Sequence, residues 1–168
     1  DVVKTVTHEE VSHEELGGAT THNTKSGVAD GAFDNDIDTL EQLRRFFDFL
    51  PMCNREKPPV VETTDPIDRA EPSLDSLVPR DSMKPYDIKE LIIKVVDEGD
   101  FFELQPEYAG NIVIGFGRME GRTIGFVANQ PLVLAGCLDI DASIKAARFI
   151  RTCDAFSIPV ITFEDVPG

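Results

Sequence analysis

Apolar residues recur at helical spacing in three stretches of this chain. The first stretch covers residues 36–50 and is ended by a proline, and the second begins at Asp87 and ends at Gly99. The third begins after Asp139 or Asp141 and continues to about residue 156. In each stretch the apolar residues fall on one side, so we expect three amphipathic helices.

Patterns typical of strands occur in the sequence between the second and third predicted helices and again after the third. Residues 111–118 and 122–128 flank a tight turn that contains Gly121, which predicts a hairpin. Residues 101–105 form a shorter strand candidate before it, and residues 160–163 form a short buried strand after the last helix. A strand, a helix and a second strand in succession predict a parallel pair within an α/β layer.

The remaining segments divide the chain. Residues 1–20 are expected to form two short helical pieces, in which Ser12 and Glu15 fit a capping box. Residues 21–34 are rich in Thr, Asn, Gly and Asp and predict a loop. Residues 51–85 hold most of the eleven prolines, with Asp, Glu and Ser between them. No packed element is expected there, so this stretch is the best candidate for a domain boundary.

Composition narrows the class of protein. The hydrophobic fraction of 41% and the charged fraction of 28% are typical of a soluble globular chain. The net charge of −15 argues against nonspecific nucleic-acid binding, which requires basic surface. No apolar run approaches the roughly 18–20 residues of a membrane span. Cys53, Cys137 and Cys153 are scattered and form no CxxC pair, which indicates reduced thiols.

Metal and nucleotide motifs are incomplete. The stretch Gly115-Phe-Gly117 lacks the third glycine of a dinucleotide motif and lies in a strand that enters a hairpin. His8 and His13 are five residues apart, whereas a zinc-binding helix places two histidines four apart, so we expect solvated surface there. Asp139 and Asp141 lack the glycine and the distal glutamate of a calcium loop and are better suited to helix capping. No metal is therefore expected.

Two short segments follow predicted strands at the end where α/β proteins tend to bind ligands. Amide side chains at such an edge can contact a ligand, or they can satisfy backbone groups in a turn. Backbone N–H groups after a strand can face an anion. The two segments are Asn129, Gln130 and Pro131 after the hairpin, and Val166, Pro167 and Gly168 after the last strand.

Five groups of residues occur in an order that is highly specific. They are Glu15-Leu-Gly-Gly-Ala19 with Thr21-His22, then Gly121-Arg122 through Asn129-Gln-Pro131, then Gly136-Cys-Leu-Asp139, then Ala146-Ala-Arg-Phe149 with Cys153-Asp154, and finally Asp165-Val-Pro-Gly168. Together they resemble the carboxyltransferase (β) subunits of biotin-dependent acyl-CoA carboxylases. The resemblance covers almost the whole chain and is weakest in 52–80.

This resemblance implies an α/β fold of the crotonase type, in which each of two domains is a superhelix of ββα units. Residues 1–55 would then be the C-terminal part of the N-terminal, acyl-CoA domain, and 56–84 the proline-rich connector. Residues 85–168 would be the first part of the C-terminal, carboxybiotin domain, so we expect an internal fragment of a longer subunit. Such a cut would leave the apolar faces of 37–50 and 142–156 without partners.

The implied reaction transfers a carboxyl group from carboxybiotin to the α-carbon of an acyl-CoA. Propionyl-CoA is the expected substrate, with acetyl-CoA and methylcrotonyl-CoA as alternatives. The implied partners are a biotin carboxylase, a biotin carboxyl carrier and further copies of the subunit in a hexamer-like ring, with no nucleic acid or membrane. The implied compartment is the bacterial cytoplasm or the mitochondrial matrix. A naturally short, non-catalytic assembly module of the same fold is the alternative class.

The resemblance also implies that no complete catalytic site lies in this chain, because both oxyanion turns of the family fall outside it. We therefore expect the isolated chain to be inactive. The implied acyl-CoA-side residues are Gly17, Gly18 and His22. The implied biotin-side residues are Asn129, Gln130, Pro131, Val166, Pro167 and Gly168.

Overall fold

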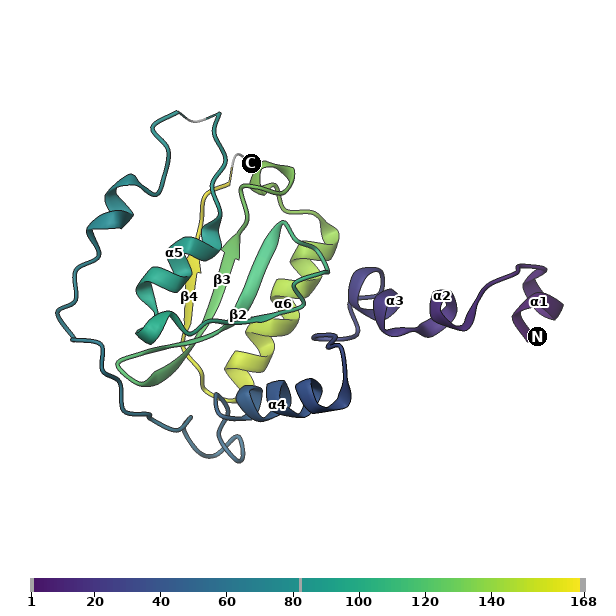
Figure 1. The fold of residues 1–168 in the computed structure, drawn as a ribbon, viewed down its shortest axis with the longest axis horizontal. Coiled ribbons are helices and arrows are strands. Elements are labelled where there is room, and N and C mark those ends of the chain that lie inside the picture. Colours follow the sequence, from purple (N-terminus) through teal and green to yellow (C-terminus); the bar gives the residue numbers. More distant parts are fainter. Residues whose placement is uncertain (1, 82, 167–168) are drawn as a thin grey trace.

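The computed structural model describes residues 2–81 and 83–166. Its body is a sheet in the order β1-β2-β3-β4 with a helix on each face, and a long arm extends from one side (Figure 1). Strands β1, β2 and β3 pair antiparallel, whereas β4 pairs parallel to β3. The mixed α/β sheet agrees with the prediction. The strands are β1 (Phe102–Leu104), β2 (Ile112–Met119), β3 (Arg122–Asn129) and β4 (Val160–Phe163).

The turn between β2 and β3 consists of two residues, Glu120 and Gly121, with φ values of 52° and 72°. Both lie in the left-handed region, as a two-residue type I′ hairpin turn requires. The carboxylate of Asp97 accepts both of their backbone N–H groups, at 3.1 and 2.7 Å. A Cβ on Gly121 would lie 1.8 Å from the carbonyl oxygen of Val61, so this position also needs glycine for space.

Helix α6 (Ile140–Ala155) connects β3 to the parallel β4, as predicted. Asp139 caps the helix, since its Oδ1 accepts the N–H of Ala142 at 2.9 Å. This hydrogen bond is the main reason that the pKa of Asp139 lies below its usual range. The prediction that residues 160–163 are buried is wrong, because they alternate between exposed and half-buried. In the described part of the chain, β4 is an edge strand paired with β3 alone.

Two hydrophobic clusters lie on opposite faces of the sheet. Successive residues of a strand point to opposite faces, so Ile114 and Phe116 join the cluster under α6, and Val113 joins the cluster under α5 (Ile88–Val95). The cluster under α6 also contains Phe102, Leu104, Ile112, Val127, Ala142, Phe149, Cys153, Ile158 and Phe49. The cluster under α5 contains Ile88, Ile92, Val96, Phe126 and Ala128.

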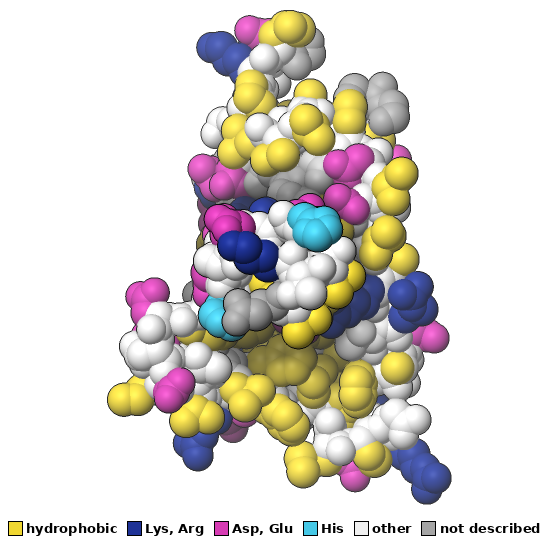
Figure 2. Space-filling view, turned by 90° about the vertical axis from the view of Figure 1, so that its right-hand side faces the viewer, with side chains coloured by type: hydrophobic (Ala, Val, Ile, Leu, Met, Phe, Trp, Pro, Cys, Tyr) yellow, Lys and Arg dark blue, Asp and Glu magenta, His cyan; other side chains and the backbone are white. Residues whose placement is uncertain are grey.

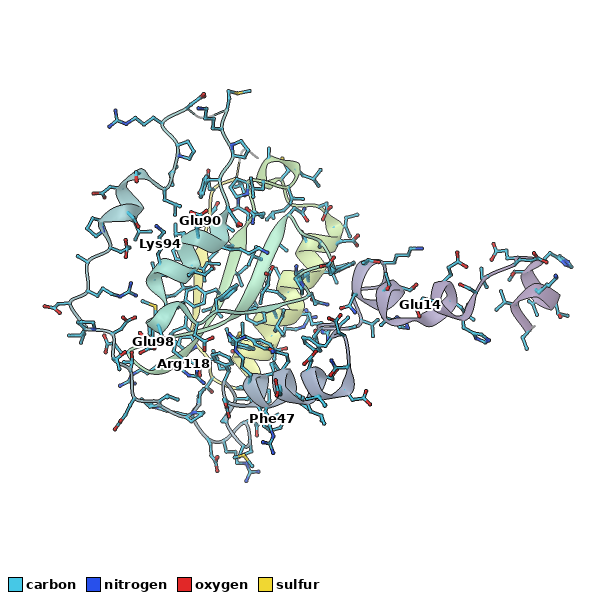
Figure 3. The ribbon with its side chains drawn as sticks, viewed as in Figure 1. Glu14, Phe47, Glu90, Lys94, Glu98 and Arg118 are labelled. Atoms are coloured by element: carbon cyan, nitrogen blue, oxygen red, sulfur yellow. The ribbon has the colours of Figure 1, made fainter. Side chains whose placement is uncertain are left out.

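Helix α4 (Asp36–Phe47) lies below the sheet in Figure 1 and is shorter than predicted. Its cap is Asn35, whose side chain accepts the N–H groups of Ile37 and Asp38 at 3.0 Å each. The chain leaves the helix before Phe49, which is fully buried against the sheet. The outward face of α4 carries exposed apolar side chains, of which Phe47 is labelled in Figure 3. The prediction that 37–50 lacks a partner holds for this outward face within the described chain. The same prediction for 142–156 is wrong, because Ala142, Phe149 and Cys153 on that face are buried against the sheet.

The arm consists of α1 (Val2–Thr7), α2 (His13–Gly17) and α3 (Ala19–Thr24) and projects away from the sheet (Figure 1). The capping box is confirmed, because Ser12 and Glu15 bond reciprocally at 2.9 and 3.2 Å. The predicted loop over 21–34 begins too early, since α3 continues to Thr24. The side chains of Asn23 and Thr24 bond back to carbonyls four residues earlier, at 2.9 and 2.8 Å, and so fit the helix.

The proline-rich segment between α4 and α5 runs along the outer side of α5 (Figure 1). Its described residues contain one short 3-10 helix, η1 (Pro72–Ser76), and are otherwise irregular, as predicted. Figure 3 shows Lys94 and Glu98 at this side of α5. Glu98 Oε1 accepts the N–H of Thr64 at 2.7 Å, and Arg69 donates to the carbonyl of Lys94 at 2.8 Å. The segment is therefore attached to the body by specific hydrogen bonds.

Candidate functional site

The carboxyl ends of β3 and β4 meet at one edge of the sheet, the upper edge in Figure 1, because the two strands are parallel. β3 ends at Asn129, and Asp165 lies two residues beyond the end of β4. The start of α5 is joined to the same edge by two hydrogen bonds, one from Tyr86 to Asp165 and one from Gln130 to Asp87. In α/β proteins this edge is the usual place for a ligand.

Asn129 joins the two strand ends. Its side chain is 4% exposed, its Oδ1 accepts the backbone N–H of Asp165 at 2.7 Å, and its Nδ2 donates to the carbonyl of the same residue. A carboxamide offers the same donor and acceptor as a peptide group. The side chain therefore continues the pairing of β3 with β4 past the last backbone pair, Ala128 with Phe163. We call this contact the Asn129–Asp165 clamp.

Gln130 follows in sequence and is 3% exposed. Its Nε2 donates to Asp87 Oδ1 at 2.7 Å, and its Oε1 accepts the backbone N–H of Ile88 at 3.2 Å. Asp87 is the cap of α5 and accepts the N–H of Lys89 at 3.0 Å. Gln130 thus ties the end of β3 to the start of α5, and its amide is engaged within the chain.

Tyr86 approaches the clamp from the other side. Its hydroxyl donates to Asp165 Oδ2 at 2.9 Å, and its ring is half-buried. Burial of the phenol, reinforced by the hydrogen bond and by the negative charge of Asp165, raises the pKa of Tyr86 to about 12. The phenol is therefore protonated at neutral pH and remains a donor.

A groove of about 420 Å³ opens beside the clamp. Its walls come from residues 83–86, from Pro131, Leu132 and Ala135, and from Asp165 and Val166. This volume is within the range of sites for small molecules, and its mixture of apolar walls with a few polar groups is typical of them.

Gly136 lies against the clamp, next to the groove residue Ala135. Its φ is 79°, and a Cβ would lie 2.7 Å from Asn129 Nδ2 and 3.0 Å from the carbonyl oxygen of Asp165. Only glycine allows the short helix η3 (Leu134–Gly136) to approach the clamp this closely. The next residue, Cys137, is held by Asn111, whose Nδ2 donates to its carbonyl at 2.9 Å.

Four of the six predicted biotin-side residues are described, and the structure brings them to this edge. Pro131 and Val166 line the groove, and Asn129 supports it through the clamp. Gln130 contacts α5 instead. Pro167 and Gly168 lie outside the described residues. Which of these residues contacts a ligand stays a prediction.

The predicted acyl-CoA-side residues lie on the arm, away from the groove (Figure 1). A Cβ on Gly17 would lie 3.6 Å from His22 Nε2, so these two residues are close neighbours. His22 Nδ1 lies 3.0 Å from Ser26 Oγ. A Cβ on Gly18 would overlap the carboxylate of Glu14. Within the described chain the two predicted groups do not form one site.

Residues 2–81 and 83–166 contain no group of three or more His, Cys, Asp and Glu side chains arranged to hold a metal ion. His8 and His13 are exposed on the arm, and Asp139 acts as a helix cap. Over the same residues, no helix has the length and apolar character needed to cross a membrane.

Tyr86, Leu132 and Ala135 were not predicted as site residues. Tyr86 lies 79 positions before Asp165, and no local pattern connects residues so far apart. The one available signal was the position of Tyr86 directly before Asp87, the predicted start of a helix at the same sheet edge. Leu132 and Ala135 follow Pro131 in a loop without periodicity, so nothing in the sequence marked them as groove residues.

The model of the carboxyl transferase domain family matches residues 1–168, the whole chain. The chain belongs to this family. The match includes the arm and the proline-rich segment as well as the sheet.

Curated members of the carboxyl transferase domain family align with the whole chain. The propionyl-CoA carboxylase beta chain of Roseobacter denitrificans is 67% identical over 168 residues, and the mitochondrial one of Homo sapiens is 58% identical over 168. The methylmalonyl-CoA decarboxylase subunit alpha of Veillonella parvula is 52% identical over 167 residues. The chain spans 33%, 31% and 33% of these relatives, about a third of their length.

Solved structures share the fold of this chain. Transcarboxylase 12S, described as a hexamer with methylmalonyl-coenzyme A and methylmalonic acid bound, matches 99% of this chain with a TM-score of 0.96 and 42% identity. The chain covers 32% of that structure. A single-chain long-chain acyl-CoA carboxylase matches 98% of this chain with a TM-score of 0.75 and 23% identity. This chain covers 16% of that structure. The expected crotonase-type α/β fold is confirmed.

Proposed function

We propose that this chain is part of a carboxyltransferase subunit and forms a wall of the site that receives carboxybiotin. The observation that carries the proposal is the alignment of the entire chain, at 67% identity, with a propionyl-CoA carboxylase beta chain. The groove at the ends of β3 and β4 gives the proposal a location, since it is the described hollow that two of the predicted biotin-side residues line.

The groove suits the ring system of biotin, which has apolar flanks and a polar ureido edge. Tyr86, Pro131 and Leu132 provide apolar surface, and Asp165 provides a polar residue at the wall. When bound, carboxybiotin would supply an activated carboxyl group and, once that carboxyl has left N1, a base for the α-proton, which leaves the acyl-CoA before the new carbon–carbon bond forms. The residues of this chain then orient the ring and exclude water from it.

Propionyl-CoA is the proposed acyl substrate, because propionyl-CoA carboxylase beta chains are 67% and 58% identical to this chain. Acetyl-CoA and methylcrotonyl-CoA are the alternatives. On the arm, Gly17, Gly18 and His22 are proposed to lie on the acyl-CoA side. The groove and the arm belong to opposite ends of the described chain, which is consistent with a division into an acyl-CoA domain (1–55), a connector (56–84) and a carboxybiotin domain (85–168).

The proposed partners are a biotin carboxylase, a biotin carboxyl carrier and further copies of the subunit in a hexamer-like ring. The hexamer is supported by the likeness to transcarboxylase 12S, whose solved structure is described as a hexamer assembly. The proposed compartment is the bacterial cytoplasm or the mitochondrial matrix, since the relatives include a bacterial chain and a mitochondrial one.

The test uses the full-length subunit that carries this chain, with methylmalonyl-CoA labelled in its free carboxyl group and free biotin as acceptor. The carbon–carbon bond to the label breaks, a bond to biotin N1 forms, and the N1 proton ends on the α-carbon of the propionyl-CoA. We expect labelled carboxybiotin and unlabelled propionyl-CoA in equal amounts. Absence of transfer with the carboxylated forms of all three acyl-CoAs would overturn the proposal.

A non-catalytic assembly module is the second candidate, and the exposed apolar face of α4 favours it. Such a module would bring the full-length protein into an oligomer while moving no label to biotin. The same labelling experiment, run beside a measurement of oligomeric mass, therefore separates the two functions.

A further inference from the structure

We propose that Tyr86 is a positioning residue of the carboxyltransferase, which acts through Asp165 to set the wall of the groove for biotin. The inference rests on the proposed function and adds a residue to it. Tyr86 lies outside the segments that the sequence marked as biotin-side, and it enters the site from the proline-rich segment rather than from a strand end.

Asp165 is held at three points by two elements. Asn129, at the end of β3, binds its backbone N–H at 2.7 Å and also its backbone carbonyl. Tyr86, just before α5, binds its carboxylate at 2.9 Å. The two bonds from Asn129 lie on one peptide-like edge, so they fix the distance between the strand ends but allow the segment to pivot about that edge. The contact with Tyr86 prevents this rotation.

The hydrogen bond also fixes where a negative charge lies. Asp165 is the carboxylate in the groove wall, and carboxybiotin itself carries a carboxylate. Two like charges a few ångströms apart repel each other, most strongly where water is excluded. By donating its proton to Oδ2, the phenol of Tyr86 holds that carboxylate against the wall and offsets part of its charge.

The backbone around Tyr86 is itself fixed, so the phenol can hold the carboxylate of Asp165 in one position. It lies between Pro85, whose ring restricts the backbone, and Asp87, the cap of α5. Asp87 in turn accepts a hydrogen bond from Gln130 Nε2 at 2.7 Å. The position of the phenol is therefore tied to both α5 and β3. This anchoring gives buried Gln130 a purpose although it does not line the groove.

The experiment replaces Tyr86→Phe in the full-length subunit and measures the transfer of carboxyl from methylmalonyl-CoA to free biotin. The ring stays and the hydrogen bond is lost. We expect KM for biotin to rise about tenfold, the order expected for a hydrogen bond to a charged group, and KM for methylmalonyl-CoA to change by less than about twofold. A merely structural role would change both constants or only the thermal stability.

Two variants of the partner residue complete the test. Asp165→Asn keeps an oxygen that accepts from the phenol, so it should bind biotin much better than Asp165→Ala. Asp165→Ala should raise KM for biotin about as much as Tyr86→Phe does. The double variant Tyr86→Phe, Asp165→Ala should have a biotin KM no higher than that of the more impaired single variant, because the two residues act as one unit. Additive losses in the double variant would overturn the inference.

The control is Tyr108→Phe, which removes the hydroxyl of another tyrosine near an aspartate, Asp141, away from the groove. It should leave KM for biotin unchanged. An unchanged biotin KM in Tyr86→Phe, or equal rises for both substrates, would overturn the inference while leaving the proposed function in place. Failure of the unaltered subunit to transfer any label would instead overturn the proposed function itself, and the inference with it.

Discussion

Lys145 is a lysine at a core position. Its side chain is 2% exposed, and its ammonium group donates to backbone carbonyls of the segment that leads into β2. Removal from water lowers the pKa of Lys145 to about 8, which still leaves it charged at neutral pH. The acceptors are Gln105 at 2.9 Å, Tyr108 at 2.7 Å, Ala109 at 3.3 Å and Ile112 at 2.9 Å.

Replacing Lys145→Met should lower the free energy of unfolding by about 2–4 kcal/mol, because the methionine leaves buried carbonyls without a donor. Urea denaturation at pH 7 measures this change. Lys89→Met is the matched control, since Lys89 forms a partly exposed ion pair with Glu103 at 2.8 Å. This substitution should lower the free energy of unfolding by less than about 1 kcal/mol. Equal losses in both variants would show that the carbonyl contacts of Lys145 contribute nothing specific.

Single residues were predictable from the sequence where their role is local. Ser12 and Asp139 cap helices that begin at the next residue, and a short spacing rule identifies such caps. Asn129 was found as a strand-end amide, but its partner Asp165 lies 36 positions away. The contact with Tyr86 and the burial of Lys145 depend on the packing of distant segments, which no local spacing encodes.

At the scale of elements, apolar periodicity predicted the hairpin, α5, α6 and the parallel strand β4. It identified the apolar side of each helix but not what covers that side, so the outward face of α4 could not be distinguished from a core face. It also missed α3, which polar residues form. Thr24 and Asn23 are poor helix residues in isolation and are accommodated there by side-chain bonds to the preceding turn.

The β2–β3 turn gives a prediction for an element. Gly121→Ala places a methyl group against the carbonyl oxygen of Val61 at a positive φ, so we expect a loss of about 2 kcal/mol or more and release of the segment around Val61. Thermal unfolding and amide hydrogen exchange measure the two effects. Gly110→Ala is the control, because a Cβ there meets only Val133 at 3.8 Å and should change stability by less than about 0.5 kcal/mol.

At the scale of the whole molecule, apolar side chains remain on the outside of the body. Figure 2 shows them gathered below the arm, around a hollow. A second hollow of about 550 Å³ follows the outer side of α6 and includes Ile140 and Ile144. Monomeric proteins seldom expose apolar surface so continuously. The exposed apolar residues of α4 are Ile37 (70%), Leu40 (60%), Leu43 (50%) and Phe47 (55%).

We expect the 168-residue chain on its own to self-associate, and sedimentation velocity over a range of concentrations measures this. Replacing Leu40→Lys together with Phe47→Lys should shift the chain toward the monomer, because charged side chains on the α4 face oppose its burial. Glu41→Lys, an exposed polar position on the same helix, controls for the added positive charge. A monomer at every concentration would contradict this expectation.

The separation of the groove from the arm is also a property of the whole molecule. Sequence reasoning placed candidate residues on both, but only the fold shows that they lie far apart in the described chain (Figure 1). Composition and periodicity gave no reason to separate them. The family resemblance predicted which residues belong to the acyl-CoA side and which to the biotin side. The groove, the clamp and the contact of Tyr86 with Asp165 were found only in the structure.

The central claim is that the groove beside the Asn129–Asp165 clamp receives biotin, and its most direct test is to fill the groove. In the full-length subunit, Leu132→Trp adds an indole to the groove wall, and KM for free biotin is measured with methylmalonyl-CoA as donor. We expect at least a tenfold rise in biotin KM and an unchanged KM for methylmalonyl-CoA. The control is Ile93→Trp on the exposed side of α5, which should leave both constants unaltered. An unchanged biotin KM in Leu132→Trp would contradict the claim.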